Sequence, residues 1–135
     1  MWKTTDSGWD NSPRWDEGLV EAIDLNGWLH LDLLLLASMA EELGRPPAEA
    51  QAWRYQAARH AATVEACLWD SEAGVFWDRL PTTNASVKVV TPASFWSLLA
   101  AIATPEQAVA QVKALLTPDN LRTPFAMPVV GHSEK

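Results

Sequence analysis

The sequence predicts an all-α domain of helical hairpins with one small β-hairpin insertion. Apolar residues recur at helical spacing through most of residues 18–116, and Gly or Pro interrupts that pattern at short intervals. The pattern changes near residues 69–78, where turn-forming residues precede a short apolar run. A length of 135 residues suits one domain. We therefore expect one domain over residues 1–135, with a loop at 1–17, helices over 18–116 and an irregular tail at 117–135.

The first predicted helix begins near Gly18 or Leu19 and ends at Leu43. Gly44 suits the position after a helix, and Pro46 with Pro47 prevents continuation. Apolar residues occupy nearly every face of its second half: Trp28, Leu29, Leu31, Leu33–Leu36 and Met39. A helix that is apolar all round is buried, so this helix needs neighbours on all sides.

The second predicted helix runs from about Pro47 to Leu68. Its apolar stripe has a spacing of three to four residues and consists of Trp53, Ala57, Ala61, Val64 and Leu68. Turn residues at 70–74 and the extended run Val75–Trp77 then predict a small hairpin or edge strand. Residues 79–91 are polar and predict an irregular segment.

Two Thr-Pro pairs mark the starts of the last two predicted helices. Thr91 is the expected N-cap of a helix to about Ala103, with Pro92 at its first position. Thr104 and Pro105 repeat this signal for a helix that ends near Leu116. The helices are joined by short connections, and no fixed repeat of the tetratricopeptide kind is present.

The composition excludes several classes of protein. Ten Lys and Arg stand against 17 Asp and Glu, a net charge of −7 that argues against binding to nucleic acids or anionic membranes. No apolar run approaches the ~18–20 residues of a membrane span. The N-terminus lacks the features of a signal peptide, which predicts a cytoplasmic protein. A single Cys67 excludes an internal disulfide framework.

The sequence contains no pattern typical of a metal or cofactor site. The three histidines are scattered, no cysteine pair exists, and no phosphate-binding or nucleophile motif is present, so we predict no metal and no cofactor. The segment Asp6–Asp16 instead gathers three carboxylates, one guanidinium and two indoles. Glycoside cleavage uses such groups: a carboxylic acid beside an apolar wall, an indole platform, and an arginine that holds hydroxyls or orients a carboxylate. Composition alone favours a simpler interpretation, a capping loop with Ser12 or Asp16 as N-cap and packed tryptophans.

One resemblance favours the catalytic interpretation. Ser7–Asp16, Ser-Gly-Trp-Asp-Asn-Ser-Pro-Arg-Trp-Asp, resembles the signature of glycoside hydrolase family 63, and family 37 trehalases carry a related motif. The resemblance continues in the same order over nearly the whole chain, at Asp24–Asn26, Leu68–Asp78, Pro92–Thr104 and Thr123–Pro128. It implies an (α/α)6 toroid of helical hairpins, of which this chain would be a part, and an inverting hydrolase of α-linked glucosides or mannosides that needs no cofactor.

The resemblance also implies roles for individual residues. Asp10 corresponds to the general acid. Trp9 and Arg14 would line the subsite of the cleaved sugar, a small saccharide or glycoside being the expected partner. The remaining candidates are Asn11 and Trp15 for substrate binding, and Asp6, Asp24 and Asn26 as supporting residues behind them.

The sequence departs from the family pattern in its number of helices and in its catalytic base. A toroid of six hairpins needs about twelve helices, and the sequence predicts four. The glutamate base of the family follows a segment that is absent here, and Glu134 occupies no family motif. We therefore expect a truncated catalytic domain, inactive or nearly so in isolation, that self-associates to cover exposed helix faces. The alternative is a non-catalytic helical scaffold or carbohydrate-binding module, which would tolerate Asp10→Asn. A tetratricopeptide-like interaction domain is a more distant third.

Overall fold

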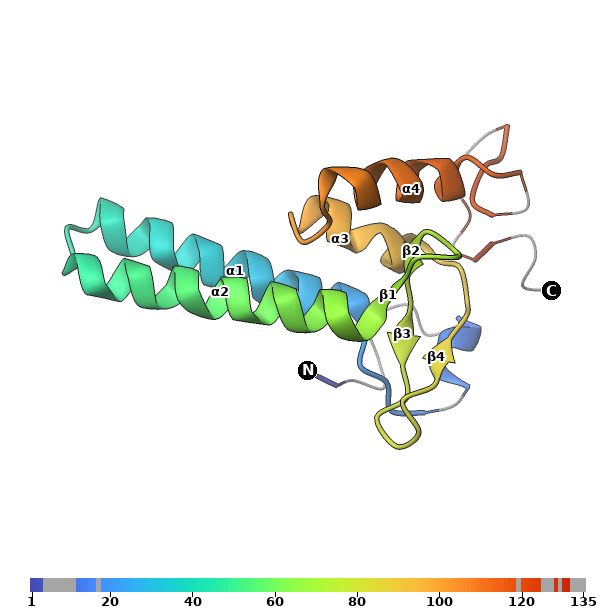
Figure 1. Cartoon of the computed structure of the whole chain (residues 1–135), viewed down its shortest axis with the longest axis horizontal. Coiled ribbons are helices and arrows are strands. Elements are labelled where there is room, and N and C mark those ends of the chain that lie inside the picture. The colour runs from blue at the N-terminus through green and yellow to red at the C-terminus, as the bar shows by residue number, and fades with distance from the viewer. Residues whose placement is uncertain (4–11, 17, 119, 125–127, 129, 132–135) are drawn as a thin grey trace.

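The computed structural model describes residues 1–3, 12–16, 18–118, 120–124, 128 and 130–131. Its main feature is a long antiparallel hairpin of two helices, α1 (Ile23–Glu42) and α2 (Pro47–Leu68). Gly44 adopts a φ of 62° in the turn between them, a conformation that favours glycine. The tip of this hairpin extends away from the remaining elements, which gather around its other end (Figure 1).

The second helix has the boundaries that the sequence predicts. Pro47 occupies its first turn, where a missing N–H costs nothing, and Ala57, Val64 and Leu68 are buried along the predicted stripe. Val64 and Leu68 enter the largest apolar cluster, which also contains Ile23 of α1 and Phe76. The core therefore lies at the base of the α1–α2 hairpin, where the β-strands and later helices meet it.

Two short antiparallel hairpins follow α2, where the sequence predicts one. The predicted hairpin consists of β1 (Trp69–Asp70) and β2 (Val75–Phe76), with Trp69 opposite Phe76. The second pairs β3 (Asp78–Arg79) with β4 (Ser86–Val87), so the prediction of an irregular segment over 79–91 was wrong at these strands. The sequence does not indicate the second hairpin, because its strands are only two residues long and lie among polar residues. In β4 only Val87 is buried.

The predicted helix over 92–103 is interrupted. It consists of a 3-10 helix, η2 (Pro92–Phe95), followed by the single helical turn α3 (Trp96–Leu99). Ala101 has a φ of 54°, outside the helical region, which ends the element before Ala103. The last helix, α4 (Pro105–Leu115), begins as predicted, because Thr104 Oγ1 accepts a hydrogen bond from the Gln107 amide at 3.2 Å.

The first predicted helix begins later than expected, at Ile23. A 3-10 turn, η1 (Pro13–Trp15), precedes it. Gly18 adopts a φ of 84°, and the Glu21 backbone pairs with that of Arg79 in an isolated β-bridge. The Glu21 amide and carbonyl bond to Arg79 of β3, and Ala22 has an extended backbone, so α1 does not begin before Ile23.

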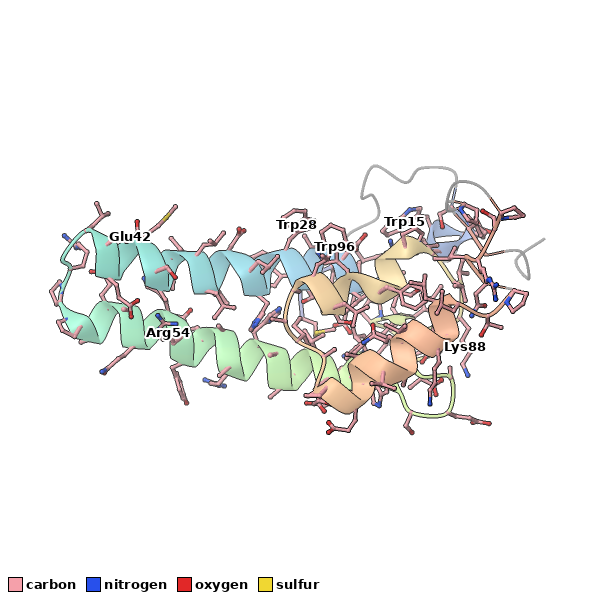
Figure 2. The ribbon with its side chains drawn as sticks, turned by 90° about the horizontal axis from the view of Figure 1, so that it is seen from above. Trp15, Trp28, Glu42, Arg54, Lys88 and Trp96 are labelled. Carbon is pink, nitrogen blue, oxygen red and sulfur yellow. The ribbon has the colours of Figure 1, made fainter. Side chains whose placement is uncertain are left out.

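The expectation that α1 is buried on every face was wrong for the described chain. Trp28 and Leu35 are more than half exposed, although Trp28 also packs against Trp96 of α3 with ring centroids 4.9 Å apart (Figure 2). Further exposed apolar residues on the same helix are Leu36 and Met39, and Leu43 follows its end. Among the described residues, no helix has both the length and the apolar character that crossing a membrane requires.

Candidate active site

The candidate site is built on η1, the short turn that carries the second half of the Ser7–Asp16 motif. Ser12 caps this turn: its Oγ accepts a hydrogen bond from the Arg14 amide at 3.4 Å. Pro13 occupies the first position, where its fixed φ favours the turn. As a result the Arg14 side chain points into the protein, where it is 1% exposed.

Arg14 joins two carboxylates from distant parts of the chain. Its Nη1 and Nη2 donate to Asp24 Oδ2 and Oδ1 at 2.9 and 3.1 Å, a bidentate contact with the first turn of α1. Its Nε donates to Asp78 Oδ2 of β3 at 2.6 Å. The Arg14–Asp24–Asp78 cluster thus connects η1, α1 and β3, and every guanidinium nitrogen is engaged.

All three side chains of the cluster are buried, so water solvates their charges only weakly. Burial raises the pKa of Asp78 above the usual carboxyl range, and the facing Arg14 opposes this shift. Burial alone would lower the pKa of Arg14, but the charges and hydrogen bonds of Asp78 and Asp24 outweigh it and raise that pKa. Arg14 is therefore cationic at all working pH values.

Asn26, two residues after Asp24, anchors the N-terminal segment. It is fully buried, its Oδ1 accepts from the Trp2 amide at 3.1 Å, and its Nδ2 donates to the Trp2 carbonyl at 3.0 Å. The same Nδ2 lies 2.7 Å from the Ala22 carbonyl. The first turn of α1 thus holds the chain on both sides of residues 4–11: Trp2 through Asn26, and Arg14 through Asp24.

The structure brings together three of the candidate residues predicted from the sequence and places a fourth beside them. Arg14, Asp24 and Asn26 meet around the start of α1, as described above. Trp15 is half-buried, and the Arg14 guanidinium carbon lies 4.6 Å from the centre of its ring. The other predicted candidates lie outside the described residues: Asp6, Trp9, Asp10 and Asn11.

Sequence reasoning missed Asp78, the second partner of Arg14. Its Oδ1 accepts the Ile23 amide at 2.9 Å, so the side chain also satisfies the first backbone donor of α1. Next to it Arg79 pairs with Glu21 at 2.6 Å. The only available signal was the position of Asp78 within a motif that resembles the family. Nothing in local spacing could indicate a contact across 64 positions.

A cavity of about 440 Å³ opens beside η1, between that turn and the β3–β4 hairpin. Its polar groups are the carboxylate of Asp16, the hydroxyl of Ser86 and the ammonium of Lys88, which also lies 3.4 Å from Asp70. Trp15 and Lys88 lie at the end of the molecule opposite Glu42 at the hairpin tip (Figure 2). The remaining residues that line the cavity are Pro13, Leu80, Ala85, Val87 and Val89.

Three solved structures have the same fold as this chain. Neutral trehalase Nth1 from Saccharomyces cerevisiae superposes with a TM-score of 0.80 at 24% identity, over 95% of this chain and 25% of that one. An uncharacterised conserved protein from Thermus thermophilus gives 0.83 at 20% identity, over 98% and 44%. The family 63 mannosylglycerate hydrolase from the same organism, in complex with glucose, gives 0.70 at 24% identity, over 84% and 26%. The described part of the chain is consistent with part of an (α/α)6 toroid.

Sequence comparison identifies the family. A cytosolic neutral trehalase from Neurospora crassa is 31% identical over 64 residues, which are 47% of this chain and 9% of that protein. The chain thus spans less than half the length of each relative named here. The model of the mannosylglycerate hydrolase MGH1-like glycoside hydrolase domain matches residues 1–135. The chain therefore belongs to the MGH1-like family of glycoside hydrolases.

Proposed function

We propose that this chain contributes the general-acid side of the active site in an inverting glycoside hydrolase that acts on α-linked glucosides or mannosides. The observation that carries the proposal is the cluster formed by Arg14 with Asp24 and Asp78. A motif arginine that is 1% exposed and paired with two carboxylates fixes the turn that closely follows Asp10. Precise placement of a proton donor is what general acid catalysis requires.

In this proposal Asp10 donates its proton to the oxygen of the departing group. Trp9, Trp15 and Asn11 contact the sugar, with indole faces stacking on its ring. In an inverting enzyme a second carboxylate, roughly 6.5–9.5 Å from the acid, activates water on the opposite face. No motif of this chain matches the family base, so we propose that the base lies outside these 135 residues.

In this proposal Arg14 supports the active site without contacting the sugar. The sequence leaves two roles open for it, holding sugar hydroxyls or orienting a carboxylate. Its three nitrogens already bond to Asp24 and Asp78, which favours the orienting role. Asp24 and Asn26 support the same turn, one through Arg14 and the other through the Trp2 backbone.

The proposed substrate class is supported by the relatives and by the cavity beside η1. The relatives include a neutral trehalase and a mannosylglycerate hydrolase, both named for the hydrolysis of a glycoside. The cavity of about 440 Å³ offers hydroxyl, carboxylate and ammonium groups that suit the hydroxyls of a saccharide. The Neurospora relative is described as cytosolic, which supports the proposal that this protein is cytoplasmic.

The proposal is tested by hydrolysis assays on the natural protein. Trehalose, kojibiose, nigerose, glucosylglycerate and mannosylglycerate are compared with α-glucosyl fluoride, whose leaving group needs little protonation. We expect Asp10→Asn to lower kcat for the saccharides by about 10²–10⁴-fold and to affect the fluoride far less. NMR of the first-formed sugar should show inverted anomeric configuration.

A matched control is Asp32→Asn, which removes an exposed carboxylate of α1 away from the motif. It should leave all rates within about twofold. Equal saccharide turnover in Asp10→Asn and the unsubstituted protein would favour the alternative, a helical scaffold or carbohydrate-binding module without catalysis.

A further inference from the structure

Asp78 is the one member of the Arg14–Asp24–Asp78 cluster that lies in the β-hairpin region. It is 6% exposed and uses both carboxylate oxygens. Oδ2 accepts the Arg14 Nε–H at 2.6 Å, and Oδ1 accepts the Ile23 amide at 2.9 Å. The N-cap residue of α1, Ala22, has no side chain that could satisfy this amide. Asp78 therefore joins the start of α1 to the turn that carries Arg14 and Trp15.

These two hydrogen bonds require a side chain with two acceptor oxygens, which a carboxylate provides. Asparagine has the same shape but only one acceptor oxygen. If that oxygen accepts from Ile23, the amide Nδ2–H faces the Arg14 Nε–H, and two donors meet. Asp78→Asn therefore removes the contact with Arg14 in particular, while Arg14 retains its bidentate contact with Asp24.

We propose that Asp78 is a positioning residue of the active site: it fixes the direction of the Arg14 guanidinium and so holds η1 against the first turn of α1. Its catalytic consequence rests on the proposed function, because it acts through the turn that follows Asp10 and carries Trp15. The fixing of Arg14 is a property of the described residues and is measured without any activity.

NMR of the Arg Nε–H groups measures that fixing directly. Arg14 Nε–H should give a resonance that exchanges slowly with water, assigned by its loss in Arg14→Lys. Asp78→Asn should raise this exchange rate by about tenfold or more. The Arg79 Nε–H, bonded to Glu21 at 2.6 Å, is an internal reference and should change little.

Asp70→Asn is the matched control variant. Asp70 belongs to the neighbouring hairpin, where its carboxylate accepts from the amides of Glu72 and Ala73 and from the Trp77 indole. The same chemical change there should leave the Arg14 signal unaltered. An unchanged Arg14 signal in Asp78→Asn, or fast exchange already in the unsubstituted chain, would overturn the proposal.

Kinetics in the natural protein separate positioning from a general loss of folding. Asp78→Asn should lower kcat for trehalose-type substrates by about tenfold, with KM within about twofold and turnover of α-glucosyl fluoride nearly unchanged. A variant that is partly unfolded loses all these rates equally, and that result refutes a positioning role. If Asp10→Asn has no effect, the proposed function fails, while the NMR experiment still decides whether Asp78 fixes Arg14.

A second variant covers the case in which Asp78→Asn does not fold. Arg14→Lys keeps the positive charge but cannot contact Asp24 with two nitrogens and Asp78 with a third. We expect faster hydrogen exchange of the bonded amides of Trp15, Asp16 and Gly18, and the same loss that depends on the leaving group. Unchanged exchange and equal losses on every substrate would contradict the proposal.

Discussion

The Trp96 indole lies against the backbone of Gly27, so closely that a methyl group on Gly27 would stand 2.4 Å from Trp96 Cδ1. Trp96 is also in contact with Trp28. The glycine inside α1 therefore allows α3 to approach, although glycine costs about 1 kcal/mol in a helix relative to alanine.

Gly27→Ala should lower the free energy of unfolding by about 1–2 kcal/mol, because the clash with Trp96 outweighs the better helix propensity of alanine. Urea unfolding followed by circular dichroism measures the change. In a Trp96→Ala background the same substitution should become stabilising, by up to about 1 kcal/mol. A stabilising Gly27→Ala in the unsubstituted chain would show that Trp96 does not pack there.

Arg14→Met should cost about 3–5 kcal/mol of unfolding free energy, since it leaves the buried carboxylates of Asp24 and Asp78 without a counter-ion. The control is Arg54→Met. Arg54 pairs with Glu41 at 2.8 Å, yet both side chains are about half exposed, so we expect a change below about 1 kcal/mol. Similar costs for the two variants, measured by denaturant unfolding, would argue against a buried cluster.

Stability should fall as the pH is lowered from about 7 towards 5. His30 Nδ1 donates to the Ala57 carbonyl at 3.1 Å and His60 Nε2 to the Asn26 carbonyl at 3.0 Å, between α1 and α2. Burial lowers the pKa of both histidines below the ordinary 6.5. The unfolded chain therefore binds protons first, and each histidine destabilises the fold by at most about 1.4 kcal/mol per pH unit below that value.

Urea unfolding at pH 7.5, 6.5 and 5.5 measures this slope. His30→Gln and His60→Gln should each reduce it, because glutamine does not titrate. A free energy of unfolding that is the same at all three pH values would rule out buried neutral histidines between the two helices.

Thr104→Ala should destabilise the chain by about 1 kcal/mol. Thr104 and Gln107 cap each other: the Gln107 amide donates to Thr104 Oγ1, and the Thr104 amide donates to Gln107 Oε1 at 2.9 Å. Thr63→Ala is the control, since this exposed hydroxyl donates to a carbonyl within α2, that of Arg59. Thermal unfolding of both variants should show a lower Tm for Thr104→Ala alone.

The exposed apolar residues of α1 predict self-association of the purified chain. Leu35 and Met39 are each 55% exposed, one helical turn apart. Sedimentation velocity should show a mass that rises with concentration, and Leu35→Lys with Met39→Lys should abolish the rise. Tyr55→Lys, on the exposed face of α2, should leave it unchanged. A monomer at all concentrations would contradict the prediction.

The sequence alone determined the elements whose signals are local. The α2 helix follows from its apolar stripe and Pro47, and the start of α4 follows from Thr104 and Pro105, because caps and periodicity act within a few residues. The family could also be identified from the Ser7–Asp16 motif, which needs no knowledge of contacts.

Tertiary structure decided the start of α1, the second hairpin and the role of Arg14. Helix α1 starts only at Ile23 because the backbone of Glu21 bonds to that of Arg79, which is 58 positions away. The β3–β4 hairpin pairs Asp78 with Val87 and Arg79 with Ser86, and these strands have too few residues to give a periodic signal. Arg14 is buried because Asp24 and Asp78 converge on it. A buried charge is stable only when its partners surround it, and the fold alone brings residues 14, 24 and 78 together.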